Sequence, residues 1–441
     1  MAQRQSNSNA GKGTFYGWYV VGAMFFMFML SVGGRQGFGL FFDAWRDQFG
    51  ISISFLSAIA AAGWVINGLA QPVVGGLTDR FGGKVVMVVS TLVLGLGTIA
   101  MSMAPNVWML AAIYVPIVSV AMAGVMVVPA TAVIARWFRR RRGAALGVFS
   151  AGASVGGMLL IPFMAFLMVL TDWRVVWMAV GGATLVLAFP LVAIIVKNSP
   201  REVGAWQDGD DEPAGGPEGD LSTGFEALGP LAVDRWKSAY RSAPMWQLTT
   251  SYIACGVTTA IISVHFVPFA TDKGISTGTA ALAFGLLSFL NLLGVLSVSW
   301  LSDRILRKNA LGVIYAVRGL AFLMLVILPM PVGLWVFAAL AGASWLASVP
   351  QTSALTAEIY GIKKAGTLNG MLNMIHQLGG AAAVLLAGIT FDAFGSYTPA
   401  FLGALATLVV ASAMSFSVKE RKCSVRFVQA NPSPGLVAEG A

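Results

Sequence analysis

Residues 75–84 read GGLTDRFGGK and join two long apolar runs, residues 53–78 and 84–103. Each run is long enough to cross a hydrocarbon core of about 30 Å as an α-helix. Between them, the charged pair Asp79-Arg80 precedes Gly82, and glycine permits the tight backbone that a short turn needs. The stretch therefore predicts a charged connection between two transmembrane helices.

Apolar runs of this length recur along the chain. Of its 441 residues, 57% are hydrophobic and 11% are charged, and the mean hydropathy is +0.77. A water-soluble domain would not tolerate such a surface, so the bilayer is the natural solvent. The pattern predicts an all-α membrane protein with twelve transmembrane helices, over residues 16–42, 53–78, 84–103, 108–137, 143–170, 173–196, 245–270, 280–301, 310–328, 334–357, 366–391 and 398–418.

The charged connection has a second copy. The triplet Gly-Ile-Ser at 50–52 and again at 274–276 begins 29 residues before an Asp-Arg pair, and the second pair is Asp303-Arg304. The offset of 224 residues also relates Asn67 to Asn291. Such a duplication predicts two pseudo-symmetric six-helix bundles with a solute site between them. We expect an N-terminal tail (1–15), the first bundle (16–196), a polar linker (197–243), the second bundle (244–418) and a C-terminal tail (419–441).

The chain has a net charge of +9, and the distribution of its basic residues indicates how the chain is oriented in the membrane. Most Lys and Arg fall on one side if the N-terminus is cytoplasmic, whereas Arg46, Arg174 and Lys273 fall on the other side. Both termini are therefore expected in the cytoplasm, and no nucleic-acid partner is expected. The polar N-terminus precedes an apolar run too long for a signal peptide. We expect a multi-pass protein of the plasma membrane, a bacterial inner membrane in particular.

The spacing Gly-x-x-x-Asp-Arg-x-Gly-x-Lys resembles the connection between helices 2 and 3 of the major facilitator superfamily. The resemblance implies the major facilitator fold and transport by alternating access. It implies that the motif is a conformational latch, made in the first half by Gly75, Asp79, Arg80 and Arg136. In the second half the polarity reverses, and we expect Asp303 and a pair between Arg304 and Glu358. The alternative is that these are ordinary solvated loop charges.

Other stretches resemble the monocarboxylate transporter family and its bacterial relatives, including oxalate–formate exchangers. They are YGW (16–18), GRQGFGLFF (34–42), NSPREVG (198–204) and HFVP (265–268). The resemblance places Arg35 near a helix 1 lysine of animal members, and His376 in the helix that carries a basic residue in the exchangers. Where animal members have Asp and Arg in helix 8, this chain has Asn291 and Val295.

Few ionisable side chains lie within the spans, and each is a functional candidate because burying it is costly. Arg318 and His376 lie near mid-span, and Arg35 and His265 lie nearer the outer ends. No Asp or Glu lies deep in any span, so a substrate carboxylate is a suitable counterion for the arginines. The alternatives are that Arg318 caps backbone carbonyls and that Arg35 extends to water.

Polar residues also gather on one helical face within the spans. Asn369, Asn373 and His376 share a face of the eleventh span, and Asn291 marks the eighth. We expect these four residues to bind substrate together with Arg35 and Arg318. The alternative is hydrogen bonding between helices. Proton coupling would pass through His376, His265 or the substrate itself.

The sequence thus predicts a secondary carrier for a small organic anion, specifically a monocarboxylate such as lactate or pyruvate moved with a proton. The alternatives are an efflux carrier for larger apolar compounds and a non-transporting membrane sensor. No nucleotide-binding loop, metal-ligand cluster or catalytic constellation occurs in the sequence. We therefore expect no enzyme activity, cofactor, metal or obligate protein partner.

Overall fold

The computed structural model describes residues 14–138, 141–209, 229–233, 235–302, 304–361 and 365–428. These residues form helices and turns and contain no strand. Twelve helical stretches are long and apolar enough to cross a membrane, which confirms the predicted fold class. Their bounds are Tyr16–Gln36, Ile53–Thr78, Gly83–Ser102, Val107–Trp137, Gly143–Leu170, Trp173–Ile195, Ala243–Asp272, Thr277–Val298, Arg307–Ile327, Val332–Tyr360, Thr367–Phe394 and Thr398–Ser417. We call them spans 1 to 12.

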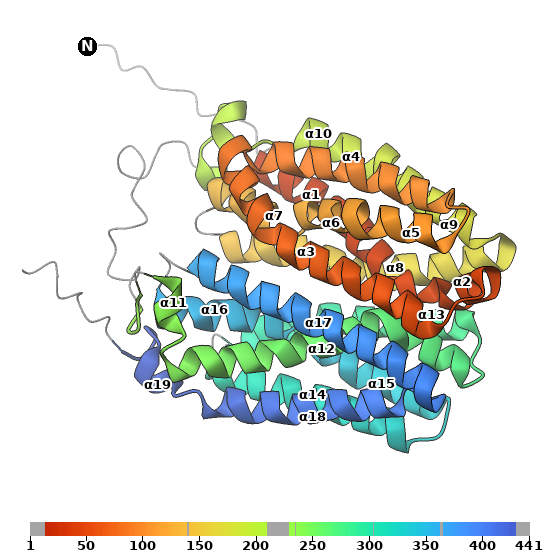
Figure 1. The fold of residues 1–441 in the computed structure, drawn as a ribbon. Helices are drawn as coiled ribbons and strands as arrows, with labels where there is room; N and C mark the ends of the chain where they lie inside the picture. Colours follow the sequence, from red (N-terminus) through yellow and green to blue (C-terminus); the bar gives the residue numbers. More distant parts are fainter. Residues whose placement is uncertain are drawn as a thin grey trace, which may run out of the picture.

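Spans 1 to 6 form the N-half, and spans 7 to 12 form the C-half (Figure 1). The N-half consists of α1 (Tyr16–Gln36), α2 (Phe42–Phe49), α3 (Ile53–Phe81), α4 (Gly83–Ser102), α5 (Val107–Ile113), α6 (Ser119–Val125), α7 (Val127–Trp137), α8 (Arg142–Leu170), α9 (Trp173–Ala183) and α10 (Phe189–Ile195). The linker holds α11 (Trp236–Ala239). The C-half consists of α12 (Ala243–Asp272), α13 (Thr277–Ser302), α14 (Arg307–Ile327), α15 (Val332–Ser344), α16 (Ser348–Tyr360), α17 (Ala365–Phe394) and α18 (Thr398–Ser417), and α19 (Glu420–Cys423) follows it.

The two halves meet along two pairs of helices. α3 packs against α17, and α8 packs against α13. In Figure 1, α3 and α17 run side by side across the boundary between the halves. Because α3 and α13 are equivalent in the repeat, as are α8 and α17, the two contacts are related by the pseudo-two-fold symmetry.

Several spans are not continuous α-helices. Span 1 breaks at Gly37, so its helix ends earlier than the predicted Phe42, and a 3-10 turn (Phe38–Phe41) leads into α2. Span 4 contains a π-helical segment, Tyr114–Val118, and a bend at Met126. Span 10 is interrupted between α15 and α16, at residues 345–347. Hydropathy reports only the length of an apolar run, so it does not detect these breaks.

The two halves are in close contact at one end of the bundle. We call the face that carries α19 and the start of α1 the terminal face, and the opposite one the distal face (Figure 1). At the distal face the Ser54 amide donates to Asp392 Oδ2 over 3.0 Å, from α3 to α17. Gly39 leaves no room for a Cβ against the Val264 carbonyl of α12. The structure is therefore closed at the distal face.

Candidate functional site

Arg35 lies in the last turn of α1 and turns inward, into the N-half. Its guanidinium stacks over the Trp64 ring, with Cζ 4.1 Å from the ring centroid. Nη1 contacts the Met126 Sδ at 3.9 Å, and Nη2 is enclosed without a hydrogen-bond partner. Among the described residues no carboxylate forms an ion pair with Arg35. Arg35 is half-buried as a whole, but its enclosed Nη2 remains an unused donor.

Arg35 lines a cavity inside the N-half. The cavity measures about 30 Å³, which is room for about two waters. Apolar side chains and a few hydroxyl and amide groups line it: Leu30, Ser31, Gly34, Arg35, Gly63, Asn67, Leu94, Thr98, Tyr114, Val118, Ser119, Met122, Trp177, Val180 and Thr184. One charged donor at the edge of a largely apolar cavity suits a small anion with an apolar body.

Arg318, on α14, is completely buried, and unlike Arg35 it makes several hydrogen bonds through its guanidinium. Nη2 donates to the backbone carbonyls of Ser344 and Trp345, at the interruption of span 10. Nη1 donates to Thr258 Oγ1 over 3.1 Å. These are carbonyls that a broken helix leaves without amide partners. The geometry disfavours the predicted substrate role of Arg318 and favours the alternative, a structural arginine that caps carbonyls.

The predicted polar face of span 11 lies on α17 and turns partly toward α12. Asn373 Oδ1 accepts from the Tyr252 hydroxyl over 3.1 Å, and the His376 ring lies 4.9 Å from the Tyr252 ring. His376 Nε2 is buried without a hydrogen-bond partner among the described residues. Asn369, one turn earlier, is half-buried. Asn373 and His376 therefore share one polar cluster in the C-half, but Arg35 belongs to a cavity in the N-half.

His265, on α12, is fully buried. Its Nε2 lies 3.0 Å from the Val384 carbonyl, which can only accept, so Nε2 carries a proton and donates. Its Nδ1 has no partner among the described residues. The imidazole packs against Tyr397, with ring centroids 5.2 Å apart. In this conformation His265 is sealed from water.

Asn291 is buried, with 1% of its surface exposed, and both ends of its amide are engaged. Oδ1 accepts from the Leu346 amide over 2.8 Å, and Nδ2 donates to Ser154 Oγ over 2.7 Å. This arrangement is interhelical hydrogen bonding, the alternative to a substrate role.

The latch residues lie at the terminal face. Gly75 packs loosely against Val128, and Arg80 and Arg136 are exposed. Gly82 has φ of +82°, as a turn glycine should. The side chain of Asp79 and all of Asp303 lie outside the described residues, so the expected Asp79–Arg136 pair stays a prediction.

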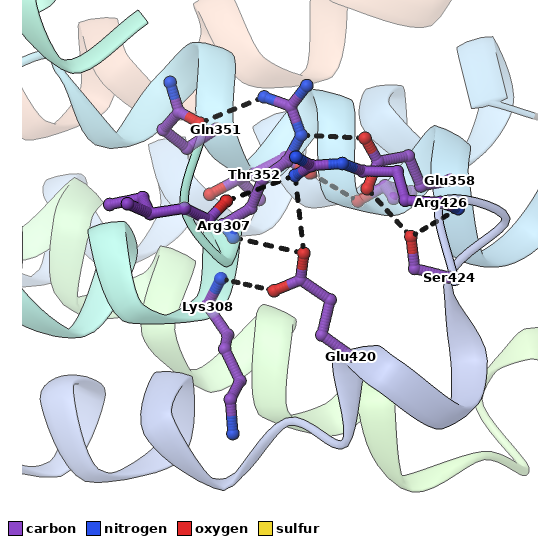
Figure 2. A network of polar contacts seen from close by, with 10 residues as sticks. Arg307, Lys308, Gln351, Thr352, Glu358, Glu420, Ser424 and Arg426 are labelled. Atoms are coloured by element: carbon purple, nitrogen blue, oxygen red, sulfur yellow. Dashed lines mark hydrogen bonds and ion pairs between the residues drawn. The ribbon is translucent and has the colours of Figure 1, made fainter. Parts of the chain in front are cut away.

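In the C-half the predicted Arg304–Glu358 pair is wrong for this conformation. Glu358 Oε1 lies 2.8 Å from Nε of Arg307, three residues further along, at the first position of α14 (Figure 2). Residues 304–306 form the non-helical connection before α14, so the start of α14, rather than charge, decides which guanidinium reaches α16. Sequence alone identified the carboxylate but not its partner.

Glu420, which the sequence analysis did not single out, completes this cluster. Its carboxylate is fully buried and accepts from the Arg307 and Lys308 amides, over 3.1 and 2.8 Å (Figure 2). It thereby caps the start of α14, whose own N-cap residue is Leu306 and offers no acceptor. In the N-half, Asn198 Oδ1 caps Lys84 at the start of α4 in the same way, over 2.9 Å. Burial beside Glu420 also raises the pKa of the Cys423 thiol to about 11.

Trp64 and Tyr114 were also missed. Both are apolar enough to count as ordinary span residues, and no spacing in the sequence distinguishes them. Only the fold brings the Trp64 ring under the guanidinium and Tyr114 into the same cavity.

Twelve spans in two repeated halves, with charged and polar groups enclosed between helices, define a polytopic membrane transporter. The family model of the Major Facilitator Superfamily matches residues 24–384. The chain belongs to the Major Facilitator Superfamily.

Relatives of similar length agree with this assignment. The chain is 25% identical over 390 residues to an uncharacterized MFS-type transporter, YcxA, of Bacillus subtilis (strain 168), covering 86% of this chain and 90% of the relative. It is 24% identical over 434 residues to Monocarboxylate transporter 13 of Bos taurus, covering 96% and 93%. It is 26% identical over 398 residues to Monocarboxylate transporter 11 of Homo sapiens, covering 88% and 79%.

A solved structure shares the fold. A bacterial homolog to the human lysosomal transporter Spinster, in an inward-facing and unoccupied conformation, superposes with a TM-score of 0.71. The two chains are 17% identical, and the match covers 96% of this chain and 100% of the other. At that identity the likeness shows the fold alone.

Proposed function

We propose that this transporter is a secondary carrier for a small organic monocarboxylate, such as lactate or pyruvate, and that Arg35 binds the carboxylate. The observation that carries the proposal is the enclosed Nη2 of Arg35, which lies at the edge of a cavity and has no hydrogen-bond partner among the described residues. An arginine keeps its charge when buried, so an anion is a suitable partner for this donor. The names of the monocarboxylate transporter relatives support the same substrate class.

The cavity limits what the substrate can be. Its volume of about 30 Å³ holds a carboxylate head, and accommodating a short tail requires small movements of the helices around it. Leu30, Val118 and Met122 offer apolar contacts for such a tail. The single charged donor at this cavity favours a small anion over the efflux of larger apolar compounds.

The proton is proposed to reach the substrate through a histidine. The chain contains two histidines, and His265 is sealed between Val384 and Tyr397. His376 has an Nε2 without a hydrogen-bond partner among the described residues. It lies in the polar cluster of the C-half, where the hydroxyl of Tyr252 and the amide of Asn373 are close to a proton that it gains or loses. His376 is therefore the better candidate for coupling. With both termini in the cytoplasm of a bacterium, closure at the distal face corresponds to an inward-facing state.

The first test is ligand-induced thermal stabilisation of the purified protein in detergent. Pyruvate and L-lactate should raise the unfolding temperature in a dose-dependent way, because a ligand that binds only the folded state stabilises it by mass action. Lactamide, which has the shape of lactate without the charge, should give no shift, and the Arg35→Gln variant should give none with any ligand.

Equal shifts with lactate and lactamide would contradict a carboxylate site. Equal shifts in the wild type and the Arg35→Gln variant would remove Arg35 from it. Stabilisation by large apolar compounds alone would favour the efflux carrier instead.

A further inference from the structure

Two buried asparagines occupy equivalent places in the two halves. Asn67 lies midway along α3 and Asn291 midway along α13, at the repeat offset of 224 residues. Each is 1% exposed. A primary amide in a bilayer must use both its donor and its acceptor, because an unpaired polar group there is costly.

Asn67 joins span 4 to the opposite half. Its Nδ2 donates to the Ser119 carbonyl over 3.0 Å, where the π-helical segment passes into α6. Its Oδ1 accepts from Gln377 Nε2 over 2.8 Å, and Gln377 belongs to α17 of the C-half. Because the Ser119 carbonyl can only accept, the orientation of the Asn67 amide is fixed.

Asn291 makes the mirrored connection. Its Oδ1 accepts from the Leu346 amide, in the interruption of span 10, where no helical carbonyl pairs with that N–H. Its Nδ2 donates to Ser154 Oγ on α8 of the N-half. Ser154 and Gln377 lie 223 residues apart, one short of the repeat offset, so the partners are equivalent as well.

Three hydrogen bonds cross between the halves within the described residues, and two of them are these. The third, between Ser54 and Asp392, lies at the distal face. The asparagine bonds lie near the middle of the bundle, where a rocking motion displaces atoms least. They are therefore placed to persist while the faces open and close, and to transmit the motion.

We propose that Asn67 and Asn291 are coupling residues, which tie the interruptions of spans 4 and 10 to the movement of the opposite half. Each amide holds the irregular backbone of its own half with one end and a side chain of the other half with its other end. Asn67 also lines the Arg35 cavity. A movement of α17 would therefore shift the wall of that cavity, because Gln377 of α17 is hydrogen-bonded to the Asn67 side chain. The proposal does not depend on the identity of the substrate.

The test replaces the partner that each asparagine has in the opposite half, and measures the backbone of the interrupted span in the asparagine's own half. Hydrogen–deuterium exchange is followed in the protein in lipid nanodiscs, over residues 119–126 of span 4 and residues 344–348 of span 10. Gln377→Leu should speed exchange in span 4 by about three- to tenfold, the factor expected for one lost hydrogen bond, and leave span 10 unchanged. Ser154→Ala should do the reverse.

Ser263→Ala is the matched control, because its hydroxyl bonds only within its own helix, to the Thr259 carbonyl. It should alter neither segment. The proposal fails if Gln377→Leu leaves span 4 unchanged, or if either variant loosens both segments equally. The two variants lie in different halves, so if Gln377→Leu does not fold, Ser154→Ala still decides the outcome for span 10.

Discussion

Replacing Arg35 with glutamine is expected to lower the uptake of labelled pyruvate into proteoliposomes by about 100-fold, since charge-assisted hydrogen bonds worth about 3 kcal/mol are lost. Glutamine preserves length and polarity but not the positive charge. The loss should therefore reflect the anion rather than the packing over Trp64. Initial rates at several pyruvate concentrations measure the effect.

Arg35→Lys is the matched variant. It keeps the charge and loses the planar, two-pronged donor, so it should retain part of the activity with weaker apparent affinity. Size-exclusion chromatography of each variant checks that the fold is intact. Uptake by folded Arg35→Gln at the wild-type rate would remove Arg35 from transport.

Replacing Arg318 with leucine is expected to destabilise the protein by about 3 kcal/mol or more, because carbonyls in the interruption of span 10 lose their donor. The guanidinium donates hydrogen bonds to the backbone carbonyls of both Ser344 and Trp345, and no other described side chain donates to them. Thermal unfolding of the purified variant in detergent, followed by tryptophan fluorescence, measures the loss.

Arg318→Lys should recover part of this stability, since an ammonium can still donate to one carbonyl. Thr407→Ala is a suitable control, because that hydroxyl bonds only a carbonyl of its own helix. A folded Arg318→Leu variant with wild-type stability and no uptake would restore the predicted substrate role of Arg318.

The fold was predictable because the bilayer leaves few solutions. Apolar runs of about twenty residues must be helices, and the repeat around residues 75–84 and its second copy defines two equivalent halves. The breaks at Gly37 and residues 345–347 were not predictable, since they depend on partners from distant spans. Arg318 and Asn291 stabilise the second of these breaks.

The candidate site was predictable only as a set of residue types. The rarity of charge within the spans identified both arginines, but the direction of each side chain depends on packing. Arg35 lines a cavity and stacks on the Trp64 ring, whereas Arg318 donates to backbone carbonyls at the interruption of span 10. Similarly, Glu358 was identified as an ion-pair residue, but its partner is Arg307, at the first position of α14, rather than Arg304 in the connection before it.

Uptake of labelled pyruvate by the wild-type protein in liposomes is the decisive measurement of monocarboxylate transport. With the outside medium more acidic than the lumen, uptake should be saturable, faster than without the gradient, and inhibited by unlabelled L-lactate but not by lactamide. Uptake no faster than in protein-free liposomes, or equal inhibition by lactamide, would contradict the claim.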